Sequence, residues 1–304
     1  MNYDIHFRDE IFLLTTQPAW LAAQMFHNNQ SLEFDALEPR ESFIKRKLPF
    51  MKWTPTSSKS IQESEEQFLE DLKTPCEGFY VNIGDVKGSP CKIWTRVYKN
   101  NNVSEDSLTS PIVLVHGFGA GSALWALNID FLSSRNKIVI TLDLPGFARS
   151  SRCKFSSDRG KAEDQFVDCL ERWRREVGLQ QMVLVGHSFG GYLALCYALK
   201  HPQPLQQVIL VDPWGITEKP PDVSERLAGR PLVKLAWRLL MKPHNPLWPL
   251  RVSGPLGPRL ARRARPDLAQ RFQPLLGEEK LGVVLQYLYH CNAQAPTGEA
   301  AFRR

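Results

Sequence analysis

Short apolar runs alternate with helix-length amphipathic segments between residues 79 and 213. Four of these runs are β-branched and almost continuously apolar, as strands buried on both faces are. They span residues 111–116, 137–144, 181–187 and 207–212. The segments between them are long enough to be crossover helices and span residues 122–134, 161–177 and 189–200. This alternation predicts an α/β fold with a mainly parallel sheet and helices on both faces. Two earlier runs, 79–83 and 91–98, predict an antiparallel pair.

The two flanks of this predicted core have different patterns. Residues 1–48 are of mixed composition and predict no definite element, so we treat them as an N-terminal extension. Residues 49–78 combine an aromatic and basic stretch with a helix predicted over 58–72. Ser60 is its expected cap, with Glu63 three residues later as in a capping box. Residues 214–304 are rich in proline and predict a helical lid over the 79–213 core, with helices over 231–242 and 280–289.

The excess positive charge lies entirely in the predicted lid. Residues 214–304 hold 15 Lys+Arg and 7 Asp+Glu, a net +8, whereas residues 1–213 hold 23 and 25, a net −2. Basic charge suits nucleic acid or anionic lipid, but no nucleic-acid recognition motif accompanies it. Anionic headgroups are therefore one candidate partner, and a solvated helix face is an equally good alternative. The arginines concerned are Arg259, Arg262, Arg263 and Arg265.

Composition also bears on the cellular compartment. The six cysteines are scattered without a CxxC pair, which argues against a disulfide framework or a zinc site and favours reduced thiols in the cytosol. We expect no metal and no cofactor. The best membrane-span candidate, residues 11–26, is interrupted by Pro18 and preceded by acidic residues, so it fits neither a spanning helix nor a signal peptide.

A G-x-S-x-G motif, Gly186-His187-Ser188-Phe189-Gly190, stands between an apolar run and a predicted helix. A serine in a sharp strand-to-helix turn has strained backbone torsions and needs small neighbours, which the glycines supply. The turn lifts the hydroxyl clear of the sheet, so Ser188 is the predicted nucleophile. The alternative is a glycine-rich turn in which Ser188 has no chemical role.

A second glycine-rich loop, His116-Gly117-Phe118-Gly119, directly follows the run 111–116. In esterases of this architecture one oxyanion donor is the amide after the nucleophile, here that of Phe189, and the other comes from this loop, here that of Phe118. Gly117 and Gly119 let the backbone approach a developing oxyanion. His116 is expected to brace the loop rather than transfer protons. A phosphate-binding function is not favoured, because no Gly-Lys-Ser/Thr follows.

Three further motifs are distinctive: DLPGFARSS at 143–151, ILVDPWG at 209–215 and YHCNAQAPTGE at 289–299. We expect Asp143 and Arg149 to pin the first of these loops. Together with the two glycine-rich motifs, these three motifs resemble those of the α/β-hydrolase subfamily that contains the N-acyl-phosphatidylethanolamine lipase and the lipid-droplet lipase co-activator. In the co-activator branch an asparagine replaces the elbow serine. Because this chain has Ser188, it resembles the hydrolase branch.

The resemblance implies a serine hydrolase or acyltransferase for acyl esters or amides of phospholipids, active in lipid homeostasis. Its candidate reactions are hydrolysis of N-acyl-phosphatidylethanolamine or of a lysophospholipid, and acylation of lysophosphatidic acid. The alternative is a non-catalytic lipid-droplet adaptor that regulates a triacylglycerol lipase. The partners implied are a phospholipid or lysophospholipid substrate, a membrane or lipid-droplet surface, and lipid-droplet coat proteins or a lipase. Nucleic acid is not among them.

The sequence supplies no evident general base for Ser188. The family places its triad acid and histidine after strands later than any predicted here, so we expect both to be absent and the C-terminal strands and helices to be missing. The edge of the 207–212 strand would then be exposed. Asp212 lies where some hydrolases relocate their acid, although a structural role is favoured. His201, His244 and His290 are weak candidates for the base. The resemblance also implies an H-x-x-x-x-D signature linked to acyl transfer, and none of the seven histidines has the Asp that this signature requires.

Phe50 and Trp53 lie among basic residues and predict an interfacial membrane anchor. The resemblance supports this, because the family carries a Trp-rich segment here; packing against the domain is the alternative. The lid aromatics Trp214, Trp237, Trp248 and Phe272 could cover an acyl chain. We therefore expect a cytoplasmic protein bound peripherally to lipid droplets or the endoplasmic reticulum, with the mitochondrion as a further candidate.

Overall fold

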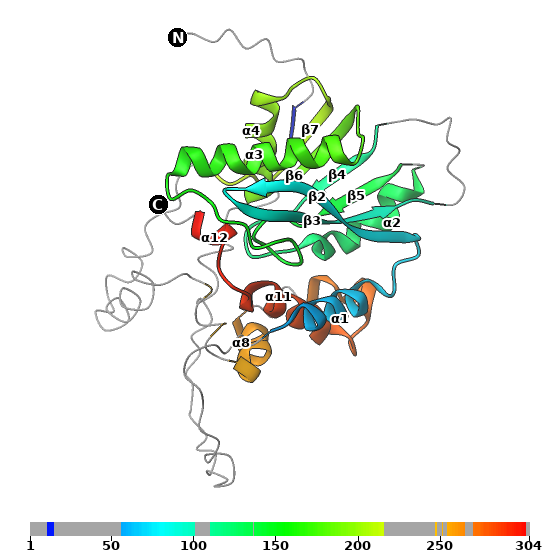
Figure 1. The fold of residues 1–304 in the computed structure, drawn as a ribbon. Helices are drawn as coiled ribbons and strands as arrows, with labels where there is room; N and C mark the ends of the chain where they lie inside the picture. The colour runs from blue at the N-terminus through cyan, green and yellow to red at the C-terminus, as the bar shows by residue number, and fades with distance from the viewer. Residues whose placement is uncertain are drawn as a thin grey trace, which may run out of the picture.

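A computed structural model describes residues 11–14, 56–100, 110–135, 137–215, 247, 251, 254–264 and 270–301. Its centre is a seven-stranded sheet in the order β1-β7-β6-β4-β5-β3-β2 (Figure 1). The strands are β1 (Ile11–Leu14), β2 (Cys76–Val86), β3 (Ser89–Tyr98), β4 (Ile112–Val115), β5 (Val139–Leu142), β6 (Met182–His187) and β7 (Leu205–Val211). Strands β2, β3 and β5 pair antiparallel and all other pairs are parallel. The predicted mainly parallel α/β sheet is confirmed.

Helices cover both faces of the sheet, and the alternation along β4 shows how. Val113 and Val115 belong to the core shared with α3 (Arg159–Glu176) and α4 (Phe189–Lys200). Leu114 points to the other face, where it packs with Ile129 of α2 (Ala126–Ser134), which a 3-10 turn, η2 (Ser122–Trp125), precedes. Side chains on both faces of the strand are therefore buried, which explains the continuous apolar run in the sequence.

Strand β1 corrects two expectations about the edge of the sheet. Residues 1–48 predicted no definite element, yet Ile11–Leu14 pairs in parallel with β7, in register from Ile11 with Val208 to Leu14 with Val211. The β7 edge is therefore covered rather than exposed, because β1 supplies partners for its backbone groups. A run of four apolar residues without flanking turn signals is too short for periodicity to identify. The predicted absence of C-terminal strands stays a prediction.

Helix α1 (Ser58–Leu69) packs against the lid helix α11 (Leu281–Ala293), and both lie with α8 (Gly257–Ala264) on the opposite side of the strands from α3 in Figure 1. Phe68 of α1 joins this packing, with its ring centroid 5.0 Å from that of Phe272 and 5.6 Å from that of Tyr287. The predicted cap, Ser60, is corrected: Ser57 is the N-cap, and its hydroxyl accepts from the Ser60 amide at 3.0 Å.

The rest of the described lid consists of short elements: η3 (Gly254–Leu256), α10 (Gln273–Leu276) and α12 (Gly298–Ala301). The helix predicted over 280–289 corresponds to α11, while the helix predicted over 231–242 lies outside the described residues. None of the helices described is long and apolar enough to cross a membrane.

One pair of cysteines departs from the prediction of reduced thiols throughout. Cys91 of β3 and Cys153, in the loop after β5, form a disulfide, with a Cα–Cα distance of 6.0 Å. The tertiary fold brings them together, because β3 runs beside β5 and Lys92 exchanges hydrogen bonds with Ser151. Their sequence separation of 62 residues gave no local signal. Within the described part of the chain, no cluster of three or more His, Cys, Asp or Glu residues could hold a metal ion.

Candidate active site

Ser188 occupies a strained turn between β6 and α4. Its φ and ψ are 52° and −113°, a left-handed conformation that an L residue rarely adopts. The end of β7 holds this turn: the Ser188 amide donates to the Val211 carbonyl at 3.0 Å, and the Ser188 carbonyl accepts from the amides of Trp214 at 2.9 Å and Tyr192 at 3.0 Å. None of the hydrogen bonds between described residues involves the Ser188 hydroxyl.

The glycines around this turn are required by close backbone approaches. A Cβ on Gly186 would lie 2.3 Å from the Gly190 carbonyl oxygen. A Cβ on Gly190 would lie 2.5 Å from the carbonyl oxygens of both Val115 and His116. The G-x-S-x-G pattern therefore has a steric cause here: a side chain at Gly186 would open the elbow itself, and one at Gly190 would force the elbow away from β4.

The loop Gly117–Gly121 lies directly beside the elbow. A Cβ on Gly117 would be 3.1 Å from the Cβ of Ser188, so the two segments are in contact at this point. The Ala120 amide donates to the Gly117 carbonyl at 3.3 Å, and Gly119 has a φ of +66°. This is the pattern of a type II turn, which requires a positive φ at its third residue. Phe118, the predicted oxyanion donor, is the second residue of the turn.

His116 braces this loop, as the sequence predicts. Its Nδ1 donates to the Gly117 carbonyl at 2.8 Å, and its Nε2 accepts from the Leu144 amide at 2.9 Å. Because Leu144 supplies a donor and Gly117 an acceptor, the imidazole is the neutral Nδ1–H tautomer. Burial lowers the pKa of His116 to about 4. The ring is therefore fixed in place by both nitrogens and is not available to take a proton from Ser188.

Asp143 pins the next loop, also as predicted. Its carboxylate accepts from the amides of Ser122 at 2.7 Å and Arg149 at 2.9 Å. Burial raises the pKa of this carboxyl, and the two amide hydrogen bonds oppose that rise. The side chain of Arg149 points elsewhere and binds Glu65 of α1. Asp143 thus links the start of η2 to the loop after β5 beneath the candidate site.

The lid motif at 289–299 touches both of these loops, a role that sequence reasoning missed. The Asn292 amide donates to the Gly119 carbonyl at 2.6 Å. The Gln294 amide donates to the Ala148 carbonyl at 3.0 Å. Two residues before the motif, in the same helix, the Tyr287 hydroxyl accepts from the Ala123 amide of η2 at 3.4 Å. The distinctive motif was the only sequence signal, and it gave no indication of the partners.

The structure does not bring His201 or His290, the described candidates for the general base, to the Ser188 hydroxyl. His290 binds the Thr56 hydroxyl through Nδ1 at 2.9 Å, so it faces α1. His201 ends α4, thirteen residues and therefore about 20 Å of helix from Ser188. Asp212 follows β7 with a φ of 44°, and its charge opposes the lowering of the His187 pKa that burial causes. His244 lies outside the described residues.

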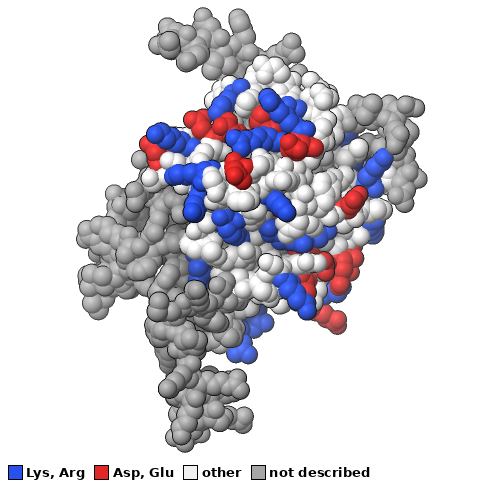
Figure 2. Space-filling view, in the orientation of Figure 1, with Lys and Arg blue, Asp and Glu red and all other residues white. Residues whose placement is uncertain are grey.

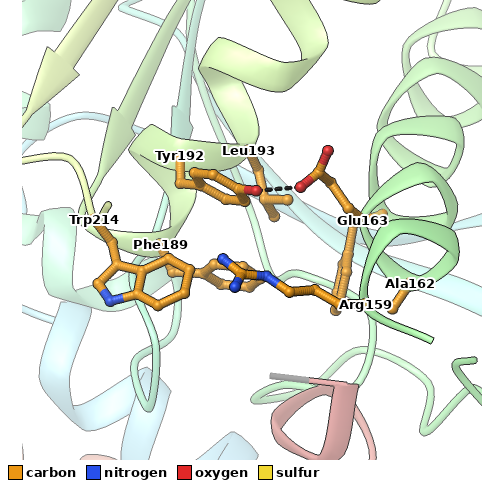
Figure 3. A pocket seen from close by; sticks show the side chains of 8 residues that line it. Arg159, Ala162, Glu163, Phe189, Tyr192, Leu193 and Trp214 are labelled. Atoms are coloured by element: carbon orange, nitrogen blue, oxygen red, sulfur yellow. Dashed lines mark hydrogen bonds between the residues drawn. The ribbon is translucent and has the colours of Figure 1, made fainter. Parts of the chain in front are cut away.

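A small depression lies beside the elbow, between the first turns of α3 and α4 (Figure 3). Phe166, Phe189 and Leu193 give it an apolar wall, and Trp214 is 40% exposed at its edge. Its polar side chains are Arg159, which lies 5.6 Å from the Trp214 ring centroid, and Glu163, which accepts from the Tyr192 hydroxyl. The depression is thus apolar inside with charged groups at its rim.

Other residues expected to contact lipid are placed only in part. Phe272 is buried against Phe68, which puts it in the packing between α1 and the lid rather than over an acyl chain. Arg259 and Arg262 of α8 are exposed. The remaining residues lie outside those whose side chains are described: Phe50, Trp53, Trp237, Trp248, Arg263 and Arg265.

Charges on the face that carries α3 are mixed in sign. Lys, Arg, Asp and Glu side chains are interspersed there in Figure 2. Some are paired: Lys200 binds Asp164 and Asp168, each at 3.0 Å. A mixed and paired surface of this kind does not form the continuous basic stripe that nucleic acid requires.

Comparisons with known proteins identify the family of the chain. Residues 110–301 match the family model described as the alpha/beta hydrolase fold. The chain is 42% identical over 248 residues to the (Lyso)-N-acylphosphatidylethanolamine lipase of Mus musculus, covering 82% of this chain and 69% of that one. It is 40% identical over 252 residues to the 1-acylglycerol-3-phosphate O-acyltransferase ABHD5 of Pongo abelii, covering 82% and 67%.

The solved structures show the fold alone. The carboxylesterase CesB from Bacillus subtilis aligns with a TM-score of 0.50 at 18% identity, covering 79% of this chain and 71% of that one.

Proposed function

Because the chain belongs to the α/β-hydrolase family, we propose that it is a serine hydrolase or acyltransferase acting on acyl esters or amides of phospholipids. One observation carries the proposal: Ser188 is held in a strained turn against the Gly117 loop, with 3.1 Å between its Cβ and a Cβ placed on Gly117. Strain of this kind is characteristic of residues whose position matters for chemistry. The names of the two relatives give the substrate class.

In the proposed reaction the Ser188 oxygen attacks the acyl carbonyl carbon. The carbonyl oxygen becomes an oxyanion facing the amides of Phe118 and Phe189. When the tetrahedral intermediate collapses, the bond to the alcohol oxygen of an ester or the nitrogen of an amide breaks, and this leaving group takes up the proton that Ser188 released. Water or an acceptor hydroxyl then attacks the acyl-enzyme, and its proton returns to the serine oxygen. The product is a free fatty acid in the first case and a new acyl ester in the second.

The general base is not assigned to His116, His201 or His290. Both nitrogens of His116 are engaged, His290 faces Thr56, and His201 lies at the far end of α4. The proposal consequently rests on the nucleophile and the two backbone donors. We propose that the acyl chain enters the apolar depression lined by Phe189 and Trp214, which is supported by the place of Phe189 directly after Ser188 and by the hydrogen bond from the Trp214 amide to the Ser188 carbonyl.

Fluorophosphonate labelling tests the nucleophile. We expect the folded 304-residue chain to be labelled and the Ser188→Ala variant to be unlabelled. Ser133→Ala is a suitable control, because Ser133 is buried in α2, away from the elbow, and should leave labelling unchanged. Turnover of N-acyl-phosphatidylethanolamine, lysophospholipid, and lysophosphatidic acid with an acyl donor would then distinguish hydrolysis from transfer. A folded chain that takes up no label would reject the enzyme and favour a non-catalytic lipid-binding adaptor.

Attachment to a lipid surface belongs to the same proposal. Phe50 and Trp53 stand among Lys45, Arg46, Lys47 and Lys52, a composition that suits the headgroup boundary of an anionic membrane or a lipid droplet. We expect the double variant Phe50→Ala and Trp53→Ala to lose flotation with phosphatidylserine-containing liposomes. A matched control is Phe131→Ala, which removes an aromatic residue that is 61% exposed on α2. Equal flotation of the double variant and the wild type would reject this anchor.

A further inference from the structure

The carbonyl groups of the Gly117–Ala120 turn are held from two directions. From the core, His116 donates to the Gly117 carbonyl at 2.8 Å. From the lid, Asn292 of α11 donates to the Gly119 carbonyl at 2.6 Å, although 173 residues separate the two. The same Asn292 amide group donates to the Leu288 carbonyl at 2.8 Å within its own helix. Because Asn292 is only 7% exposed, this geometry fixes its side chain between helix and loop.

These contacts determine where the loop amides point. The Gly117 carbonyl and the Phe118 amide belong to one peptide unit, and no described peptide bond is cis. In a trans peptide the carbonyl and the N–H point in opposite directions, so holding the Gly117 oxygen toward His116 directs the Phe118 N–H away from it. The peptide unit between Gly119 and Ala120 closes the turn, because its amide donates to the Gly117 carbonyl. Asn292 holds the carbonyl of that unit.

Steric contacts add to the hydrogen bonds. A Cβ on Gly119 would lie 3.2 Å from the Asn292 Oδ1, and a Cβ on Gly121 would lie 2.1 Å from the Tyr287 hydroxyl oxygen. Both side chains come from α11 and press against the loop at glycine positions. The α11 helix is itself anchored, since the rings of Tyr287 and Phe68 pack 5.6 Å apart.

We infer that Asn292 is a positioning residue of the oxyanion hole, through which the lid helix α11 holds the Gly117–Ala120 turn in its donating geometry. This rests on the proposed function, in which the Phe118 amide binds the oxyanion. It gives the YHCNAQ motif a role that its sequence alone did not suggest. The helix supplies no reacting group; it supports the donor. Losing that support leaves the Gly119 carbonyl without its lid partner and allows the turn to relax.

Asn292→Leu is the test variant, because it keeps a similar volume and removes the donor. Hydrogen–deuterium exchange of the loop amides and the rate of fluorophosphonate labelling are measured together, with the melting temperature as a check of folding. We expect faster exchange over residues 117–121 and labelling slower by up to roughly a hundredfold, since a misplacement of about 1 Å at a reacting site can cost that much. Gln286→Ala, at an exposed position of the same helix, is the matched control and should keep both values.

The outcomes separate this inference from the proposed function. A folded Asn292→Leu chain with wild-type labelling, or with wild-type exchange over the loop, would overturn the positioning role and leave the nucleophile intact. A folded wild-type chain without label would overturn the proposed function, and the exchange comparison would still decide whether α11 holds the loop. If Asn292→Leu does not fold, Asn292→Ala, which has no side-chain donor in any protonation state, is read in the same two ways.

Discussion

Glu65 of α1 and Arg149 of the loop after β5 form a buried ion pair, with 2.5 Å between Oε2 and Nη1. The same carboxylate accepts from Arg96 at 2.9 Å and from the indole of Trp94 at 3.2 Å. Burial raises the pKa of Glu65, and the two arginines oppose that rise. Because Asp143 accepts from the Arg149 amide, this pair connects α1 to the loops beneath Ser188.

Replacing Glu65 tests how much this connection stabilises the fold. Glu65→Ala leaves Arg96 and Arg149 buried without their partner, so we expect the free energy of unfolding to fall by about 3–5 kcal/mol. Urea denaturation followed by tryptophan fluorescence measures it. Glu66→Ala is the control, because Glu66 is exposed on the same helix and should change stability by about 0.5 kcal/mol or less. Equal losses for the two variants would contradict the importance of the buried pair.

The approach of β4 to the elbow makes a prediction for Gly190. In Gly190→Ala the new methyl group would lie 2.5 Å from the carbonyl oxygens of Val115 and His116, and backbone atoms cannot easily give way. We expect a loss of stability of about 3 kcal/mol together with loss of labelling at Ser188. Thermal unfolding and labelling of the same preparation measure both.

A matched glycine serves as the control for this variant. Gly160 lies at the start of α3. A Cβ on it would lie 3.7 Å from the Asp158 Oδ1, an ordinary van der Waals distance, so Gly160→Ala meets no steric obstacle. It should leave labelling unchanged and stabilise the chain by about 0.5 kcal/mol, because alanine favours helix over glycine. A tolerated Gly190→Ala would show that the elbow and β4 are further apart than the structure places them.

His116 predicts an acid-sensitive component of stability. Its pKa is lowered to about 4 by burial, whereas an unfolded histidine titrates near 6.5. Between these values the unfolded chain binds a proton that the folded chain does not, so stability is constant above pH 6.5 and falls as the pH drops toward 4. At pH 4.5 the loss from this residue should be about 2.5 kcal/mol. Urea titrations at pH 7, 6 and 4.5 measure it.

The His116→Gln variant separates this residue from other groups that titrate in acid. Its amide cannot be protonated in this range, so the decline from pH 6.5 to 4.5 should be shallower than in the wild type, whatever the stability at pH 7. An unchanged decline would mean that His116 is not the residue responsible. NMR titration of the wild-type protein measures the pKa of the His116 imidazole directly, and we expect a value below 5.

The parts of the fold that sequence predicted are those in which local pattern and tertiary environment agree. Strand β4 is apolar on both faces because helices cover both. Gly186 reflects a backbone contact within a single strand–turn–helix unit, and Gly190 reflects the close approach of the neighbouring strand β4. Strand β1 was missed because four apolar residues carry no period. The disulfide Cys91–Cys153 and the Asn292–Gly119 hydrogen bond were missed because each joins segments that only the complete fold brings together.

The strain at Ser188 can be measured separately from its chemistry. Both Ser188→Ala and Ser188→Gly remove the hydroxyl and should be unlabelled by a fluorophosphonate. Only glycine, however, adopts a φ of 52° with a ψ of −113° without steric cost. We expect Ser188→Gly to be more stable than Ser188→Ala by about 1 kcal/mol, since relief of roughly 1–3 kcal/mol of strain exceeds the extra conformational entropy that glycine has in the unfolded chain. Differential scanning calorimetry of the two variants measures the difference. Alanine as the more stable residue would show that the turn relaxes once the hydroxyl is gone, and that the observed torsions belong to the serine rather than to the elbow.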